Sequence, residues 1–145
     1  MHNLTLPPQP PFPVGYIIDP VAFFIALIAG PLLFTAASFW VMLIPVFALG
    51  LGGPLYLAIG TPLLLWYLRR HDGNPNDLAV LALMVIGGLG LLASITALIT
   101  QDRDALLGVA FYFGFGIIFA PIWAYFFGRV YQYLRRDFFA KPRNL

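Results

Sequence analysis

Few side chains in this sequence belong to the types that bind metals or act as nucleophiles. The only histidines are His2 and His71, and cysteine is absent. Haem held between membrane helices needs histidines that face each other at membrane depth, and thiolate chemistry needs a cysteine. His71 lies in the polar loop HDGNPND, where a solvated side chain is the simplest interpretation. The sequence therefore predicts no metal, haem or other cofactor site.

The acidic and hydroxyl side chains lack the partners that catalysis requires. Glutamate is absent, and all six acids are aspartates that flank the apolar blocks. Ion-coupled carriers usually need an ionisable group inside the membrane. Ser38 and Ser94 lie in apolar runs with no histidine or aspartate within helical reach, so backbone hydrogen bonding explains them better than a nucleophilic role. We therefore expect a protein that is not an enzyme.

Small residues recur at intervals of about four along three apolar segments. The members of these rows are Ala22, Ala26 and Gly30; Gly90 and Ser94; and Gly116, Ala120, Ala124 and Gly128. Rows of this kind let two helix backbones approach closely in a membrane. They predict helix packing, with contacts inside this chain as the simpler interpretation and contacts to another subunit as the alternative.

Aromatic side chains are unusually dense from residue 111 to residue 139. Such a surface can simply face lipid, because tyrosine and tryptophan combine an apolar body with a polar tip. The alternative is a face that binds another subunit, a lipid, a quinone or a pigment. Residue types alone do not separate these two interpretations.

The composition indicates which solvent surrounds these segments. The chain has 145 residues, of which 61% are hydrophobic and 10% are charged. A water-soluble domain of this size cannot bury so much apolar surface, so the chain must lie in a bilayer. The net charge of +2 gives no indication of nucleic-acid binding.

Residues 20–68 carry no charged side chain. As one helix this stretch would measure ~70 Å, about twice the thickness of a hydrocarbon core, so it must turn back once. Asp19 followed by Pro20 predicts a helix start. We expect a first span over residues 20–44, a reversal at residues 50–54 and a second span over residues 54–70. The alternative is a turn near Ser38 and Phe39, followed by a long second helix kinked at Pro45 and Pro54.

Two further spans are predicted over residues 78–100 and 105–128, separated by the polar turn QDRD. The last helix is expected to continue past Arg129 into a basic, aromatic tail, residues 129–145. The fold class predicted is an all-α integral membrane protein, a four-helix bundle over residues 20–128. An extended proline-rich arm, residues 1–19, precedes the bundle.

The cations predict the orientation of the bundle. Seven of the eight fall on one side of the four spans, namely Arg69, Arg70, Arg129, Arg135, Arg136, Lys141 and Arg143, and only Arg103 falls on the other. The positive-inside rule assigns the first side to the cytoplasm. We expect both termini to be cytoplasmic and the chain to lie in a cell inner membrane. Arg69, Arg70, Arg129, Arg135 and Arg136 are also candidates to bind anionic lipid headgroups.

The arm contains Pro7, Pro8, Pro10, Pro11 and Pro13, which favour extended polyproline II geometry. It has no Lys or Arg, so it is not expected to be a secretory signal. The side chains expected to dock on a neighbour are Leu6, Pro10, Pro11, Phe12 and Tyr16.

These features together favour a non-catalytic accessory or assembly subunit of a larger inner-membrane complex, such as an energy-transducing one. Its expected partners are lipid and other integral membrane subunits. The alternative is a small homo-oligomeric channel or carrier. Its pathway would use backbone carbonyls near residues 50–54 and the hydroxyls of Thr35, Thr61, Ser94, Thr96 and Tyr112.

Overall fold

Four apolar helical segments, each long enough to cross a membrane, make up most of the structure. The computed structural model describes residues 14–38, 44–136 and 143–144. The four segments are Pro20–Ala37, Ile44–Leu68, Pro75–Ile99 and Arg103–Leu134. The prediction of a helical, multi-pass membrane protein with four spans is confirmed at this level.

The first helix, α1 (Pro20–Ala37), begins where the sequence predicts but ends earlier. The Asp19 carboxylate accepts hydrogen bonds from the backbone N–H groups of Val21 (3.1 Å) and Ala22 (3.3 Å). Ser38 ends the helix, and its backbone N–H and its hydroxyl both donate to the Phe34 carbonyl. The prediction that the first span continues to residue 44 is therefore wrong.

The second span is one segment in three parts: α2 (Ile44–Leu55), the π-helix η1 (Tyr56–Gly60) and α3 (Thr61–Leu68). The predicted reversal at residues 50–54 is also wrong, because these residues are helical. Pro45 lies in the first turn of α2, where a missing N–H costs little. Pro54 lies in the helix interior and cannot donate to the Gly50 carbonyl, and the helix widens directly after it. The alternative interpretation, with a turn near Ser38, agrees with the structure.

Polar caps begin both helices of the second half of the chain. In α4 (Pro75–Ile99) the Asn74 side chain accepts from the backbone N–H of Asn76 at 3.1 Å. In α5 (Arg103–Leu134) the Asp102 side chain accepts a hydrogen bond from the backbone N–H of Ala105 at 2.9 Å. Caps of this type satisfy N–H groups that have no partner within the helix. The start of α4 at Pro75 extends that helix beyond the expected span. The end of α5 at Leu134 confirms the prediction that the last helix continues past Arg129.

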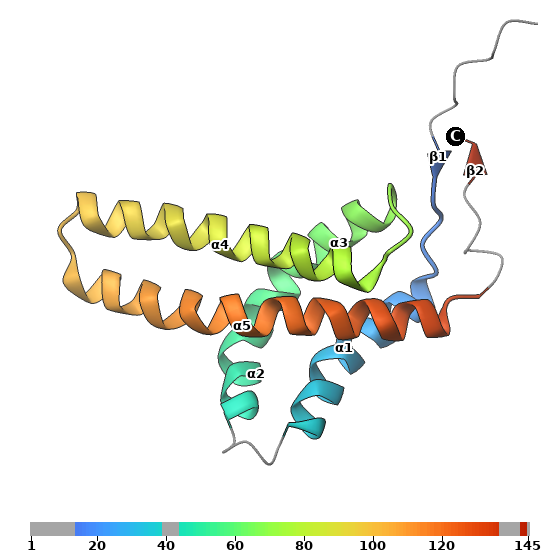
Figure 1. The fold of residues 1–145 in the computed structure, drawn as a ribbon, viewed down its shortest axis with the longest axis horizontal. Helices are drawn as coiled ribbons and strands as arrows, with labels where there is room; N and C mark the ends of the chain where they lie inside the picture. Colours follow the sequence, from blue (N-terminus) through green and yellow to red (C-terminus); the bar gives the residue numbers. More distant parts are fainter. Residues whose placement is uncertain (1–13, 39–43, 137–142, 145) are drawn as a thin grey trace, which may run out of the picture.

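The four spans meet at one end of the molecule and diverge toward the other (Figure 1). Helices α4 and α5 form a long antiparallel hairpin, and α1 packs against the C-terminal half of α5. The start of α1, the α3–α4 loop and the end of α5 come together, and we call this the polar end. Here β1 (Val14–Gly15) pairs antiparallel with β2 (Arg143–Asn144), with Val14 opposite Asn144. Residues 14–15 and residues 143–144 therefore lie side by side.

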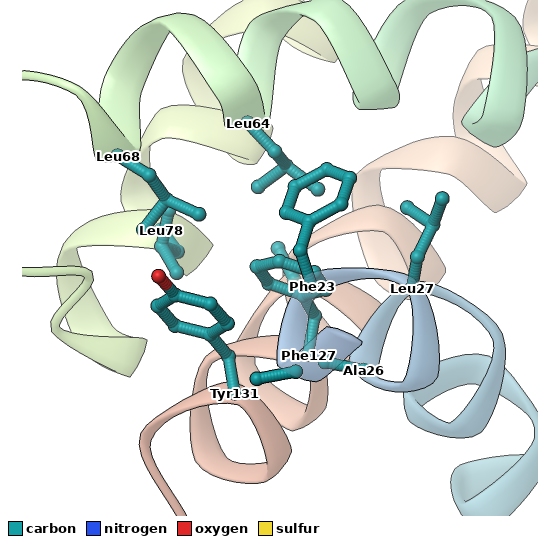
Figure 2. Packing of buried hydrophobic residues seen from close by; sticks show 10 residues of the cluster. Phe23, Ala26, Leu27, Leu64, Leu68, Leu78, Phe127 and Tyr131 are labelled. Atoms are coloured by element: carbon teal, nitrogen blue, oxygen red, sulfur yellow. The ribbon is translucent and has the colours of Figure 1, made fainter. Parts of the chain in front are cut away.

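The buried core lies next to the polar end (Figure 2). Its labelled members are Phe23, Ala26 and Leu27 of α1, Leu64 and Leu68 of α3, Leu78 of α4, and Phe127 and Tyr131 of α5. The rings of Phe23 and Phe127 meet edge to face at 5.5 Å, and those of Phe127 and Tyr131 stack at 5.9 Å. Such pairs stabilise packing beyond the area that they bury. All four spans thus contribute to this core, and a second, smaller cluster contains Ala48, Phe119 and Trp123.

The opposite half of the α4–α5 hairpin, residues 91–115, packs mainly on itself, and we call it the distal hairpin; only Phe111, Tyr112 and Phe115 of this half line a space shared with the second span. No residue in 103–115 is fully buried, and only Ala97 is buried within 91–99. Ile99 and Leu107 are 77% and 70% exposed. Near the α4–α5 turn, Figure 1 shows no other described element beside the hairpin.

Candidate functional site

A carboxylate at the polar end joins the start of α1 to the chain that follows α5. Asp19 is 1% exposed, and both of its oxygens face the Arg136 guanidinium, which donates from Nε at 2.8 Å and from Nη2 at 3.2 Å. A two-point contact of this kind is among the stronger polar contacts in proteins. The Tyr131 hydroxyl accepts from the backbone N–H of Asp19 at 3.4 Å. One residue thus caps α1 and holds the C-terminal segment.

The environment of Asp19 changes its acidity. The hydrogen bond from Arg136 holds the pKa of this carboxyl below its usual 3.8, and burial, which opposes the shift, does not cancel it. The same contact raises the pKa of Arg136. Both groups are therefore charged at neutral pH, because favourable contacts to an ionised form keep that form populated.

A second set of contacts fixes the α3–α4 loop to α5. Arg135 Nη1 lies 2.8 Å from the Asp72 carboxylate and also donates to the Asp72 carbonyl at 3.1 Å. The Gln132 side-chain amide donates to the Gly73 carbonyl at 3.2 Å. Gly73 has φ +76, and a Cβ there would lie 2.6 Å from the Leu68 side chain, so only glycine fits this turn. The loop between α3 and α4 is therefore held in one position against α5.

The arginines expected at lipid headgroups have different surroundings in the structure. Arg135 and Arg136 form the ion pairs with Asp72 and Asp19. The Arg70 guanidinium lies over the Trp66 ring, 4.9 Å from its centre, while Arg69 and Arg129 are exposed. Arg69, Arg70 and Arg129 are thus exposed and form no ion pair among the described residues.

The arm residues expected to dock on a neighbour lie mainly outside the described residues, namely Leu6, Pro10, Pro11 and Phe12. Tyr16 is described, and its backbone N–H donates to the Arg69 carbonyl at 3.0 Å. With Asp19 and the β1–β2 pair, this bond gives the root of the arm three attachments to the bundle.

The small residues on α1 lie where α1 meets α5. Ala22, Ala26 and Gly30 are buried. A Cβ at Gly30 would lie 2.9 Å from the Phe127 backbone nitrogen, so the two backbones pass each other closely at this point.

The small residues of α4 and α5 lie mostly between these two helices. A Cβ at Gly90 would lie 2.9 Å from Phe113, one at Gly116 would lie 2.7 Å from Ile86, and one at Gly128 would lie 2.8 Å from the Pro75 Cα. Ser94 donates from its hydroxyl to the Gly90 carbonyl at 2.7 Å. Ala124 is buried in the core, and Ala120 lines the apolar cleft described next. These rows therefore occupy contacts inside the chain.

An apolar cleft separates the second span from α4 and α5. It has a cavity volume of about 120 Å³, and its walls come from α2, η1, α3, α4 and α5. Four aromatic side chains follow one face of α5 along it, namely Phe111, Phe115, Phe119 and Trp123. Phe115 and Phe119 stack with ring planes 9° apart, and Tyr56 meets Trp123 edge to face at 5.6 Å. These four aromatic side chains of α5 thus form one wall of the cleft.

Two side chains that line this cleft each have a polar atom with no hydrogen-bond partner among the described residues. These atoms are Trp123 Nε1 and the Tyr56 hydroxyl oxygen, and both are buried. The Trp123 side chain approaches Gly52, where a Cβ would lie 3.3 Å from the indole ring. Gly52 therefore makes the space into which the indole packs.

The hydroxyls proposed for a channel pathway are partly engaged elsewhere. Ser94 and Thr96 donate to the Gly90 and Leu92 carbonyls of their own helix. Thr35 is buried in α1, and its hydroxyl has no partner among the described residues. Thr61 is half-buried in α3, while Tyr112 is exposed and borders the cleft. Only Tyr112 among these five residues lines the cleft.

Sequence reasoning identified Asp19 as a cap but missed Arg136 as its partner. The two residues are far apart in the sequence, and an arginine after the last span is equally expected from the positive-inside rule. The cleft was also missed, because it depends on where Gly52 and the π-helix place Tyr56. The only available signals were the glycines at 50–53 and the aromatic density on α5.

No three His, Cys, Asp or Glu side chains come together as a possible metal site in the described part of the chain. Comparison of the chain with protein-family models, curated proteins and solved structures gave no match. Its function must therefore be argued from the polar end, the cleft and the distal hairpin.

Proposed function

We propose that this chain is a non-catalytic accessory or assembly subunit of a larger complex in a cell inner membrane. Both of its termini lie in the cytoplasm, as the positions of its cations indicate. It stabilises neighbouring integral membrane subunits through helix packing and through its N-terminal arm.

The observation that carries this proposal is the distal hairpin. Residues 91–115 of α4 and α5 extend beyond the core and pack mainly on each other, with large apolar side chains exposed on both helices. Lipid tolerates such a surface, but contact with lipid alone does not explain why two helices extend beyond the core of their own bundle. A neighbouring subunit gives this half of the hairpin a packing partner.

The distal hairpin also has places where another backbone can approach. Positions for a Cβ at Gly108 and at Gly114 have no atom within 4 Å, whereas the Cβ position at Gly116 is occupied by Ile86. Small residues on an open face allow close contact between membrane helices, where van der Waals packing drives association. Gly108 and Gly114 are therefore the preferred contact points for a partner helix.

The polar end supports a role for the arm. Its root is attached through Asp19, Tyr16 and β1, so the segment that precedes residue 14 starts from a fixed position. Proline lowers the conformational entropy lost when an extended segment becomes ordered on a partner. A fixed root and a proline-rich sequence both favour docking of residues 1–13 on a neighbour.

The proposal is tested by purifying the tagged chain from its native membrane in mild detergent and measuring which membrane polypeptides accompany it in fixed ratio. Gly114→Leu should leave the chain folded, because nothing occupies the space beside Gly114, but should remove most of the partner. Deletion of residues 1–14 should weaken the association while leaving the spans inserted, and Phe12→Ala should reproduce part of that loss.

The matched control is Gly53→Leu, another change at a glycine with no atom within 4 Å of its Cβ position. It lies on the second span, away from the distal hairpin, and should keep the partner. Equal recovery of the partner with Gly114→Leu, Gly53→Leu and the arm deletion would contradict the proposal.

A further inference from the structure

We propose that a groove at the polar end binds one anionic phospholipid, whose phosphate contacts the Arg69 guanidinium while its acyl chains lie against Phe24 and Leu65. The groove lies between residues 16–18, the start of α1 and the end of α3, and we call it the arm-root groove. This inference goes beyond the role of an accessory subunit, and it does not depend on another polypeptide.

Arg69 provides the charge that such a site needs. It is the only charged residue among the described residues that line the arm-root groove. It is exposed and forms no ion pair within the described part of the chain, in contrast to Arg135 and Arg136. A guanidinium binds phosphate oxygens in two-point geometry. Charge complementarity therefore favours an anionic group beside Arg69.

The position of Arg69 in the chain places this charge at the edge of the membrane. Arg69 directly follows the apolar second span Ile44–Leu68, and its backbone N–H donates to the Leu65 carbonyl at 3.3 Å, as in the last turn of a helix. The Tyr16 backbone N–H donates to the Arg69 carbonyl at 3.0 Å, which attaches residue 16 to this turn. Phospholipid headgroups lie in the polar region just outside the hydrocarbon core. Arg69 is therefore at the depth of a lipid phosphate.

The groove has apolar walls on the membrane side of Arg69. Leu65 lies one helical turn before Arg69 on α3, and Phe24 lies one turn after Pro20 on α1, so both are about 6 Å deeper along their helices. Phe24 is 60% exposed, and Leu65 is half-buried. A charged head at Arg69 and hydrocarbon along Leu65 and Phe24 match the two ends of a phospholipid.

The size of the groove favours a lipid over a small ion. Its cavity volume is about 480 Å³, within the ~300–1,000 Å³ of typical ligand sites. A free phosphate would contact Arg69 and leave the apolar walls without a partner, whereas a phospholipid contacts both. A zwitterionic phospholipid would also bring its own cation close to Arg69, and like charges repel. The groove therefore favours an anionic phospholipid over both alternatives.

The test titrates radiolabelled dioctanoyl phosphatidylglycerol onto the purified full chain in a neutral maltoside detergent. We expect saturable binding that approaches one lipid per chain. Arg69→Gln removes the guanidinium and should raise Kd about 5- to 10-fold. Arg129→Gln is the matched control, because it removes the same charge from an exposed arginine that does not line the groove. It should leave Kd nearly unchanged, since salt screens charges outside the site.

A second pair of variants tests the apolar walls. Phe24→Ala removes the exposed aromatic side chain of the groove and should raise Kd about 3- to 10-fold. Phe47→Ala truncates a phenylalanine that is 66% exposed on α2 and lies outside the groove, and it should leave Kd unchanged. Thermal unfolding of each variant checks that the fold is retained.

A competition arm uses only the wild-type chain and so does not depend on how well any variant folds. Dioctanoyl phosphatidylcholine should compete at least about fivefold less well than unlabelled dioctanoyl phosphatidylglycerol. Glycerol 3-phosphate, which has a phosphate but no chains, should not compete. The proposal would be overturned by an absence of saturable phosphatidylglycerol binding to the folded wild-type chain, by equal competition from phosphatidylcholine or glycerol 3-phosphate, or by equal Kd values for Arg69→Gln and Arg129→Gln.

Discussion

Asp19 combines two tasks that are usually given to separate residues. Its carboxylate caps α1 through Val21 and Ala22 and also holds Arg136. A cap contributes about 0.5–2 kcal/mol to stability, while a charged group that is buried and loses its partner is strongly destabilising. Asp19 is therefore the single polar residue on which the polar end depends most.

Asp19→Asn separates these two tasks, because asparagine can still cap a helix but carries no charge. The pKa of Asp19 is lower in the folded chain than its usual 3.8. The ionised carboxylate therefore stabilises the fold above about pH 4, and this stabilisation is lost as the pH falls through the lowered pKa. We expect Asp19→Asn to lower the thermal unfolding midpoint in detergent at pH 7 and to have a smaller effect at pH 3.

Asp72→Asn is the control, because the Asp72 side chain is 55% exposed whereas that of Asp19 is 1% exposed, and ion pairs of exposed carboxylates contribute about 0–1 kcal/mol. It should lower the unfolding midpoint at pH 7 less than Asp19→Asn does. A difference between wild type and Asp19→Asn that is equal at pH 3 and pH 7 would show that the charge of Asp19 does not stabilise the fold.

The sequence predicted the local role of Asp19 but not its distant partner, for a physical reason. The motif Asp19-Pro20 is a local signal for a helix start, since capping involves only the next three residues. Contact with Arg136 depends on how α1 lies against α5, and side-chain periodicity does not specify which residues beyond the helix ends then meet. Local capping could be read from the sequence, whereas the ion pair required the fold.

At the level of helices, glycines two positions apart on α5 have opposite surroundings. A Cβ at Gly116 would lie 2.7 Å from Ile86 of α4, while one at Gly114 would have no atom within 4 Å. Gly116→Leu should therefore force α4 and α5 apart and destabilise the chain by about 1–3 kcal/mol, the usual cost of overpacking. Gly114→Leu should leave the unfolding midpoint of the isolated chain nearly unchanged. Equal midpoints for the two variants would show that Gly116 is not at a tight contact.

The close contact between α1 and α5 leads to a similar prediction for thermal stability. A Cβ at Gly30 would lie 2.9 Å from the Phe127 backbone nitrogen, and backbone cannot move aside as a flexible side chain does. Gly30→Ala should therefore lower the thermal unfolding midpoint of the detergent-solubilised chain. Gly50→Ala adds the same methyl group where no atom lies within 4 Å, and it should keep or raise the midpoint, because alanine favours helix over glycine by about 1 kcal/mol. The opposite ranking of the two variants would contradict close packing of α1 on α5.

The second span shows why the helix boundaries were only partly predictable. Gly50, Gly52, Gly53 and Pro54 are typical of a turn in water, and the first reversal was therefore expected there. In a membrane, glycine and proline are tolerated inside helices. Here Gly52 is needed for the Trp123 indole, and Pro54 precedes a π-helix rather than a turn. The number of spans followed from length and charge, but the break between the first two depended on contacts with α5.

For the whole molecule, the start of α1 lies beside the end of α5. This arrangement predicts the membrane side on which each terminus lies. The Asp19–Arg136 pair brings the start of α1 and the end of α5 together on one side, and from the positive-inside rule we predict that this side faces the cytoplasm. Reporter fusions at both termini should give cytoplasmic signals, while a fusion inserted in the α4–α5 loop after Thr100 should give a periplasmic signal. Opposite signals from the two termini would contradict an even number of spans.

The central claim is that this chain works as one subunit among others, and native mass spectrometry of material released gently from its own membrane tests it most directly. The account predicts a complex in which the 16.1 kDa chain is present in fixed ratio with at least one different membrane polypeptide. It also predicts that the chain alone in liposomes shows no ion flux above that of empty vesicles, because no charged side chain lies within residues 20–68 to offset the desolvation of an ion. A chain that appears only by itself or as a homo-oligomer, and that supports saturable flux, would contradict the account in favour of a channel or carrier.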